Sequence, residues 1–172
     1  MLTILFLPFI GVRFGLLSFV NKKALKRAAH FAPVKGNERI AYIVYQLATL
    51  ALAVMSLLLP IKSDGSVCFY LGLFSYILGL ILCAVTMVHF AFPDQAGFNQ
   101  KGIYKFSRNP IYLSYFVILI GMSLLAQSLI FGLLTLIFQV SGHWIILSEE
   151  RWCRKQFGQA YDRYRKAVRR YF

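Results

Sequence analysis

The residues best suited to chemistry lie in two short stretches in the second half of the chain. The first stretch, residues 102–112, contains Lys105 and Arg108 followed by Asn109 and Pro110. Asn is a favoured N-cap and Pro a favoured first helical residue, so this pair predicts the start of a helix. The free backbone N–H groups and positive dipole end of that helix, beside two cations, are suited to hold a carboxylate or a phosphate.

The second stretch is the acidic pair Glu149 and Glu150, which follows the uncharged residues 111–147. Ionised carboxylates next to hydrocarbon are costly without partners, so they pair with basic neighbours such as Arg108 or serve a ligand. Glu150 also shares a helix face with His143, two turns earlier, and the two form a candidate proton-relay pair. The alternative is that His143 only packs within its helix.

The cysteine and histidine residues predict no metal site. The three cysteines are widely spaced and two of them lie inside apolar runs, which indicates neither a zinc site nor a disulfide framework. His30 and His89 have no metal-ligand spacing with His143.

The composition requires a membrane around these stretches. The 172 residues are 59% hydrophobic, and the mean hydropathy is +0.63, which is too apolar for a soluble domain of this size. The 19 Lys and Arg residues exceed the 6 Asp and Glu residues, but they lie between and after the apolar runs. We therefore interpret the charge as membrane orientation and expect no nucleic-acid partner.

Four long apolar runs predict the helices that position the two stretches. The last run is long enough for two crossings, with a turn near Gln127 and Ser128, and its first arm is slightly short. The first run is the weakest, because it contains Arg13 and Pro8, and in a four-span alternative it lies in the interface. The prediction is an all-α polytopic membrane protein with about five transmembrane helices and a C-terminal helical hairpin. The runs are residues 2–20, 40–61, 67–92 and 111–147.

Charge predicts the orientation of these spans. Five spans put residues 21–39, 95–110 and 148–172 on one side, which then carries every Lys and Arg except Arg13 and Lys62. The positive-inside rule makes that side cytoplasmic, with the N-terminus outside. We expect one domain with four parts: three N-terminal spans (1–93), a cytoplasmic cofactor loop (94–110), the hairpin (111–147) and cytoplasmic tail helices (148–172).

The basic tail has an apolar stripe typical of an amphipathic helix. Gly158 is expected to split it into two short helices, and the simplest interpretation is that the stripe rests on anionic lipid headgroups. The stripe consists of Trp152, Phe157, Tyr161, Tyr164, Val168 and Tyr171.

The order and spacing of these motifs, from about Phe98 to the C-terminus, resemble the isoprenylcysteine carboxyl methyltransferase and phospholipid methyltransferase superfamily. The first three spans match only in being hydrophobic. The resemblance implies a membrane methyltransferase that uses S-adenosylmethionine, without a Rossmann fold, in a bacterial or archaeal cell membrane. The shared motifs are Gly102-x-Tyr104, Arg108-Asn109-Pro110-x-Tyr112, the apolar hairpin, Glu149-Glu150 and Phe157-Gly158-x-x-Tyr161-x-x-Tyr164.

The resemblance also implies roles for single residues. Cofactor-contact positions fall on Tyr104, Asn109, Pro110, Ile111, Tyr112 and Glu149. Asn109 stands where eukaryotic members usually have His, although Arg-Asn-Pro is familiar among bacterial relatives. Ile145 stands where the eukaryotic prenylcysteine enzymes have a substrate-binding Arg, so prenylcysteine carboxylate is not a secure acceptor.

The function predicted is methyl transfer to a lipid or lipid-modified acceptor in the bilayer. Glu150, His143 and Arg108 are the candidate catalytic residues, the first two as bases for an amine or thiol acceptor. Apolar walls near the site, at Ile111, Tyr115, Ile145 and Ile146, favour an acceptor that arrives from the bilayer. The alternatives are an NADPH-dependent membrane reductase of the sterol or steroid reductase type, and a non-catalytic membrane scaffold.

Overall fold

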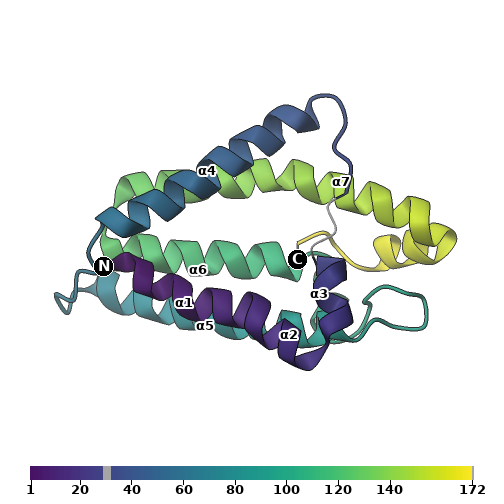
Figure 1. Ribbon diagram of the computed structural model, residues 1–172, viewed down its shortest axis with the longest axis horizontal. Coiled ribbons are helices and arrows are strands. Elements are labelled where there is room, and N and C mark those ends of the chain that lie inside the picture. The colour runs from purple at the N-terminus through teal and green to yellow at the C-terminus, as the bar shows by residue number, and fades with distance from the viewer. Residues whose placement is uncertain (29–31, 172) are drawn as a thin grey trace.

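The computed structural model describes residues 1–28 and 32–171, and every regular element in that part of the chain is a helix. The first apolar run forms one continuous helix with a π-helical segment at its centre. That helix runs lengthwise beside α5, in the direction of a span (Figure 1). Its segments are η1 (Leu2–Leu5), α1 (Phe6–Ile10), η2 (Gly11–Leu16) and α2 (Leu17–Val20).

The remaining elements are α3 (Lys22–Ala28), α4 (Glu38–Leu58), α5 (Val67–Ala91), η3 (Gly102–Lys105), α6 (Pro110–Ala126) and α7 (Leu129–Ala167). Among the described residues, four helices are long and apolar enough to cross a membrane: the N-terminal helix Leu2–Val20, α4, α5 and α7. The fifth, α6, has 17 residues, about 25 Å at 1.5 Å per residue. The polytopic helical architecture and the short first arm of the hairpin are therefore confirmed.

Helices α5 and α6 pack closely because glycines face each other's backbone. A Cβ at Gly79 would lie 2.7 Å from the backbone nitrogen of Ile118, and one at Gly121 would lie 2.5 Å from that of Tyr76. Small residues allow this backbone approach between membrane helices. The close packing aligns the first turn of α6 with the last turns of α5.

Helix α4 packs mainly along α7 and meets the N-terminal helix at one end. There the Leu2 backbone N–H donates to the Leu59 carbonyl at 2.8 Å, and the Thr3 hydroxyl donates to the Ser56 carbonyl at 2.7 Å. Towards the other end of the bundle the two helices diverge (Figure 1). The bundle is thus closed at the end of the α4–α5 loop and wider at the end that holds α3.

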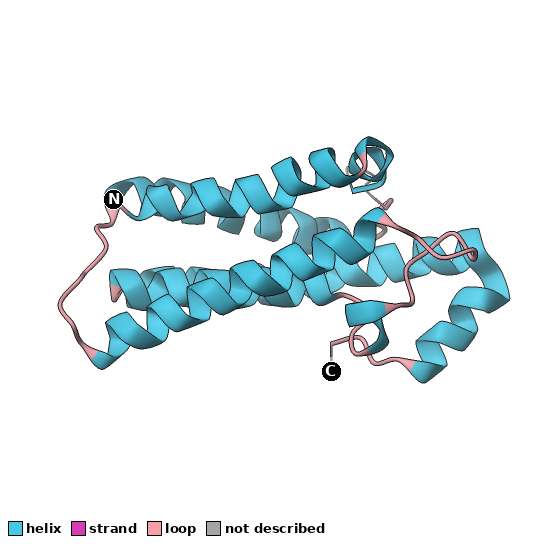
Figure 2. Cartoon of the chain, turned by 90° about the horizontal axis from the view of Figure 1, so that it is seen from below, coloured by secondary structure: helices cyan, strands magenta, loops and turns pink. Residues whose placement is uncertain are grey.

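The basic tail continues the last span without a linker. Gly158, with φ 53° and ψ −131°, interrupts α7, which confirms the predicted split of the tail. After this break the chain turns back (Figure 2) and ends beside the start of α6 (Figure 1). There the Arg108 backbone N–H donates to the Arg169 carbonyl at 3.1 Å. The tail therefore folds onto the loop before α6.

The apolar stripe of the tail packs on protein. Phe98, in the loop before α6, has its ring 5.0 Å from Phe157, 5.3 Å from Tyr161 and 5.6 Å from Tyr164. The interpretation of this stripe as a face resting on lipid headgroups is wrong, because a loop some 60 residues earlier in the chain covers it.

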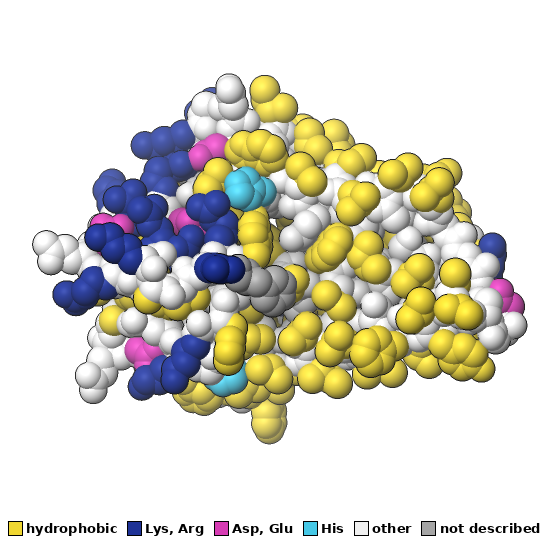
Figure 3. Space-filling view, turned by 180° about the vertical axis from the view of Figure 1, so that it is seen from behind, with side chains coloured by type: hydrophobic (Ala, Val, Ile, Leu, Met, Phe, Trp, Pro, Cys, Tyr) yellow, Lys and Arg dark blue, Asp and Glu magenta, His cyan; other side chains and the backbone are white. Residues whose placement is uncertain are grey.

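Charge and apolar surface are segregated along the bundle. Basic side chains gather at the end that contains α3 and the tail, whereas apolar side chains cover the middle (Figure 3). This distribution is that of a multi-pass membrane protein with one strongly basic face.

Candidate active site

A cavity of about 640 Å³ lies at the basic end of the bundle. Its walls come from the N-terminal helix, α3, α4, α5, the loop before α6, the first turns of α6 and both parts of α7. All six predicted cofactor residues line it, namely Tyr104, Asn109, Pro110, Ile111, Tyr112 and Glu149. Arg108 and Glu150 also line it, whereas His143 is not among its lining residues.

Glu149 presents a carboxylate to this cavity. The Tyr112 hydroxyl donates to its Oε1 at 2.9 Å, so the first turn of α6 holds this side chain from the opposite wall. In the described part of the chain, no Lys or Arg forms an ion pair with Glu149. Because a carboxylate at the edge of hydrocarbon requires a partner, Glu149 is suited to a cationic ligand.

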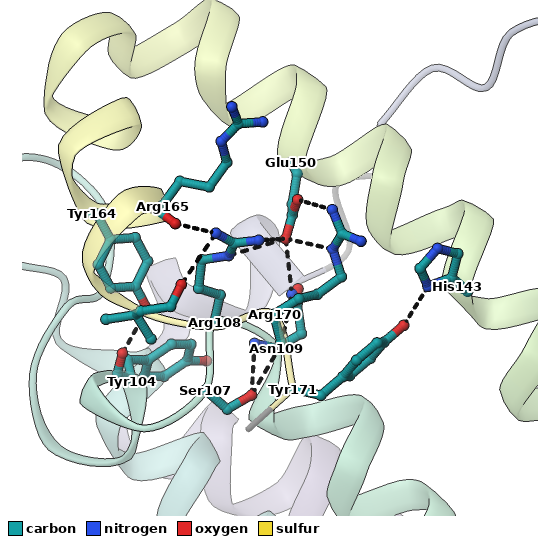
Figure 4. Close-up of polar contacts among 11 residues, drawn as sticks. Tyr104, Ser107, Arg108, Asn109, His143, Glu150, Tyr164, Arg165, Arg170 and Tyr171 are labelled. Carbon is teal, nitrogen blue, oxygen red and sulfur yellow. Dashed lines mark hydrogen bonds and ion pairs between the residues drawn. The ribbon is translucent and has the colours of Figure 1, made fainter.

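Glu150 lies in a buried cluster of polar groups (Figure 4). Arg108 donates to its Oε1 from Nη2 at 2.8 Å and from Nε at 3.1 Å, and Arg170 donates to its Oε2 at 3.0 Å. The Asn109 side-chain amide adds a donor at 3.3 Å. The Arg108 and Glu150 side chains are 6% and 5% exposed, so the pair is shielded from solvent.

Arg108 also ties the tail to the loop. Its Nη1 donates to the carbonyls of Arg165 at 2.7 Å and Val168 at 3.2 Å. Ser107 adds a hydroxyl bond to the Arg170 carbonyl at 3.2 Å. We call Arg108, Asn109, Glu150 and Arg170 the tail latch, because together they fasten the C-terminal segment against the start of α6.

His143 lies to one side of the tail latch. Its Nδ1 is 2.6 Å from the Tyr171 hydroxyl, and Figure 4 shows this contact as separate from those around Glu150. The structure does not bring His143 and Glu150 together, since each has a different partner from the C-terminal segment. Proton transfer by these two residues stays a prediction.

The start of α6 agrees with the sequence. Asn109 is the N-cap and Pro110 the first helical residue, but the Asn109 side chain makes no cap hydrogen bond. Its amide donates instead to Glu150 and to the Arg170 carbonyl at 3.3 Å. The first N–H groups of α6 consequently have no side-chain cap where the helix meets the cavity.

Tyr104 is held by its backbone rather than by its phenol. The Tyr164 hydroxyl donates to the Tyr104 carbonyl at 2.7 Å, and burial raises the pKa of the Tyr104 phenol, which therefore stays neutral. Gly102, with φ +59°, fits against α5 because a Cβ there would overlap the His89 ring. These contacts fix η3 at the rim of the cavity.

The N-terminal half supplies lining residues that the sequence motifs did not identify. Arg13, Tyr45, Met87 and Arg27 belong to four different helices and line the same cavity. The available signal was Arg13, because a charged residue inside a membrane span is itself an indication of function.

The predicted apolar walls are only partly correct. Ile111 and Tyr115 line the cavity, whereas Ile145 and Ile146, 2% and 1% exposed, are buried elsewhere in the helix packing. Both isoleucines lie about one turn before Glu149 on a similar face of α7, but the lining of the cavity does not extend to them.

The sequence of the chain matches the family described as phospholipid methyltransferase over residues 50–160. That stretch is more than half of the chain and includes α5, α6, the loop between them and Glu149. The chain belongs to the phospholipid methyltransferase family. No curated protein and no solved structure matches it.

Membership of the phospholipid methyltransferase family confirms the resemblance drawn from residues 98–172, because this family is part of the superfamily named there. It indicates a membrane methyltransferase that acts on lipids. The matched stretch leaves out the N-terminal helix, so the role of Arg13 has to be argued from its position alone.

Proposed function

We propose that this member of the phospholipid methyltransferase family transfers a methyl group from S-adenosylmethionine to a lipid acceptor at the membrane surface. One observation carries the proposal: the Glu149 carboxylate, held by Tyr112 on the wall of a 640 Å³ cavity, forms no ion pair with a Lys or Arg of the described residues, and Arg13 acts on it only from a distance. A buried carboxylate without an ion-pair partner favours a ligand that brings a cationic group to it.

The lining residues fit this cofactor. Its sulfonium and amino groups are cations, which suit Glu149, and aromatic faces such as Tyr104 and Tyr112 attract cations. Its carboxylate suits the uncapped N–H groups at the start of α6. The cavity volume of about 640 Å³ is within the range of roughly 300–1,000 Å³ typical of small-ligand sites.

S-adenosylmethionine, when bound, supplies an electrophilic methyl group. The residues of the chain have to align donor and acceptor and exclude water, because alignment provides most of the rate in such a displacement. Arg108 and Glu150 act in this proposal as positioning residues that hold the tail over the cavity. An amine or thiol acceptor additionally has to lose a proton, for which Glu150 and His143 are the proposed groups.

The acceptor is proposed to reach the cavity from the bilayer. Ile111 and Tyr115 form part of its wall, and the divergence of α4 from the N-terminal helix lies at the same end (Figure 1). An acyl or prenyl chain gains about 0.8 kcal/mol for each CH₂ buried between helices. Because Ile145 stands where a carboxylate-binding Arg is expected, acceptors with small or neutral head groups are expected to be at least as good as prenylcysteines.

Calorimetry in detergent tests the cofactor. We expect S-adenosylhomocysteine to bind and NADPH not to bind, because the amino group of the first ligand pairs with Glu149 and NADPH has no cationic group to take its place. Lys62→Gln serves as a matched control, since this exposed lysine is at the opposite end of the bundle. Binding of NADPH alone supports a reductase, and binding of neither ligand supports a scaffold; each result overturns the proposal.

A labelled-methyl transfer assay tests the acceptor. It compares phosphatidylethanolamine, a prenylcysteine, and short water-soluble thiols and acids. Efficient turnover of the soluble acceptors alone would contradict access from the bilayer. Activity on the prenylcysteine alone would contradict our interpretation of Ile145.

We also propose that the basic end is cytoplasmic and that the N-terminus is outside. The structure places residues 62–66 and the tail at opposite ends of the bundle (Figure 1), and the basic residues gather with the tail. Reporter fusions at Gly65 and at the C-terminus should therefore report opposite sides. The same side for both overturns the five-span arrangement.

A further inference from the structure

Three arginines line the cavity, and two of them have their donors engaged by the protein. Arg108 is held by Glu150 and by two tail carbonyls. Arg27 donates to the Phe90 carbonyl at 2.7 Å and packs on the Phe90 ring. Arg108 is therefore occupied by the tail latch, and Arg27 is anchored through its Nη2 to the C-terminal end of α5.

Arg13 is the third, and its partners are of a different kind. Its Nη1 is 3.4 Å from the Met87 sulfur, a weak acceptor, and its guanidinium lies 5.3 Å from the Phe14 ring and 5.9 Å from the Tyr115 ring. In the described part of the chain, no carboxylate lies within ion-pair distance of Arg13. Arg13 also donates to the Tyr115 hydroxyl, and the charge of Glu149 acts on it from a distance. A guanidinium has five donors, so this cation retains capacity for an anionic oxygen.

Arg13 lies deeper in the bundle than the carboxylate of Glu149. Tyr115 is one turn further along α6 than Tyr112, which binds Glu149, and the two rings are 6.4 Å apart. The cavity therefore presents a carboxylate near its polar end and a guanidinium about one turn closer to the hydrocarbon. The π-helical segment Gly11–Leu16 contains Arg13, and such segments are frequent at functional sites.

We propose that Arg13 binds the anionic phosphate or carboxylate of the lipid acceptor and thereby selects which lipids are methylated. This inference rests on the proposed function. Glu149 holds the cationic donor at the polar end, and Arg13 holds the anion of a lipid whose chain lies among the helices. In a phospholipid the phosphate and the head-group nucleophile are a few bonds apart. One acceptor molecule can therefore place its phosphate at Arg13 and its nucleophile near the methyl donor beside Glu149.

The position of Arg13 also accounts for Ile145. The cation that the superfamily resemblance led us to expect one turn before Glu149 is absent, and Ile145 is buried away from the cavity. A guanidinium from the N-terminal helix supplies an equivalent charge from the opposite wall. The acceptor's anion is then recognised by a segment that lies outside the family match at residues 50–160.

Binding of three probes to the purified protein in neutral detergent tests this role without requiring turnover. Two probes carry an anion, lysophosphatidylethanolamine and N-acetyl-S-farnesylcysteine, and the third is the uncharged methyl ester of the second. Arg13→Met, which keeps the length of the side chain without its charge, should weaken binding of the two anionic probes by about tenfold or more. Arg13→Lys should retain most of the binding, and the methyl ester should bind both variants like the wild type.

Controls separate this inference from the proposed function. Lys62→Gln removes a charge at the opposite end, and Gly15→Ala changes an open position on the same helix; both should bind all probes normally. S-adenosylhomocysteine affinity should stay within about threefold in Arg13→Met, since Arg13 serves the acceptor.

Several results would overturn the role of Arg13. If Arg13→Met weakens binding of the methyl ester as much as binding of the acid, Arg13 only shapes the cavity. If the same variant loses tenfold in S-adenosylhomocysteine affinity, Arg13 belongs to the cofactor site. Unchanged binding of both anionic probes also overturns it. If the wild type binds the anionic lipids through Arg13 but does not bind S-adenosylhomocysteine, the proposed function fails and the lipid site stands.

Discussion

Glu149 and Glu150 are adjacent in sequence but differ in environment. Glu150 is enclosed by Arg108, Asn109 and Arg170 in the tail latch, whereas Glu149 faces the cavity with only the Tyr112 hydroxyl as its hydrogen-bond donor. Adjacent residues in a helix point about 100° apart, so one carboxylate meets the returning tail and the other meets the cavity. A carboxylate whose hydrogen bonds and ion pairs are all made within the protein stabilises the fold. One that has a single hydrogen-bond donor is available to a ligand.

Glu150→Gln tests whether Glu150 stabilises the fold, and it has the largest expected effect of the variants compared. The substitution leaves Arg108 buried without a counter-charge, so we expect the free energy of unfolding to fall by about 3 kcal/mol. Denaturant unfolding in detergent, followed by circular dichroism, measures the loss. Glu38→Gln is the matched control, because its pair with Arg151 is more exposed and should contribute less than about 1 kcal/mol. An equal fall in the free energy of unfolding in the two variants would show that the tail latch stabilises the fold no more than an exposed ion pair does.

Glu149→Gln tests the other side of the comparison, namely that Glu149 binds a ligand. It should weaken S-adenosylhomocysteine binding by about 1.5–3 kcal/mol, because a charged partner of the ligand is lost, and it should leave stability nearly unchanged. Calorimetry provides the affinity, and the same unfolding assay provides the stability. A variant that binds as tightly as the wild type would remove Glu149 from the cofactor site.

Tyr112→Phe has the smallest expected effect and measures how Glu149 is held. Loss of one hydroxyl donor to the carboxylate should weaken S-adenosylhomocysteine binding by about 1 kcal/mol, roughly fivefold. Tyr164→Phe is the control, since its hydroxyl donates to the Tyr104 carbonyl at the rim. If Tyr164→Phe weakens S-adenosylhomocysteine binding more than Tyr112→Phe does, the position of Tyr104 at the rim of the cavity contributes more to binding than the orientation of Glu149.

Local signals explain why much of the fold was predictable. The apolar runs, the turn at Gln127 and Ser128, and the start of α6 at Asn109 and Pro110 all depend on residues within a few positions of one another. The break at Gly158 is of the same kind, since its φ of 53° is readily adopted only by glycine. The six predicted cofactor positions also line one cavity, because they lie where two neighbouring spans reach the same end.

Long-range contacts explain the errors. The aromatic stripe of the tail has the pattern of a lipid-facing helix, and nothing local indicates that Phe98 covers it. His143 and Glu150 share a helix face in sequence terms, but Tyr171 and Arg170 return from the C-terminus and bind them separately. Ile145 and Ile146 lie only four and three residues before Glu149 and yet do not line the cavity.

The sequence by itself determined the membrane helices, the basic end of the bundle and the stretches in which the site must be built, because hydropathy, helix caps and charge are properties of neighbouring residues. Only the tertiary structure decided that Glu150 pairs with Arg108 and Arg170 whereas Glu149 meets the Tyr112 hydroxyl, and that Arg13 joins the cavity from a helix more than 130 residues away. The orientation of a charged side chain depends on which partners the fold brings within hydrogen-bond distance, and those partners come from distant parts of the chain.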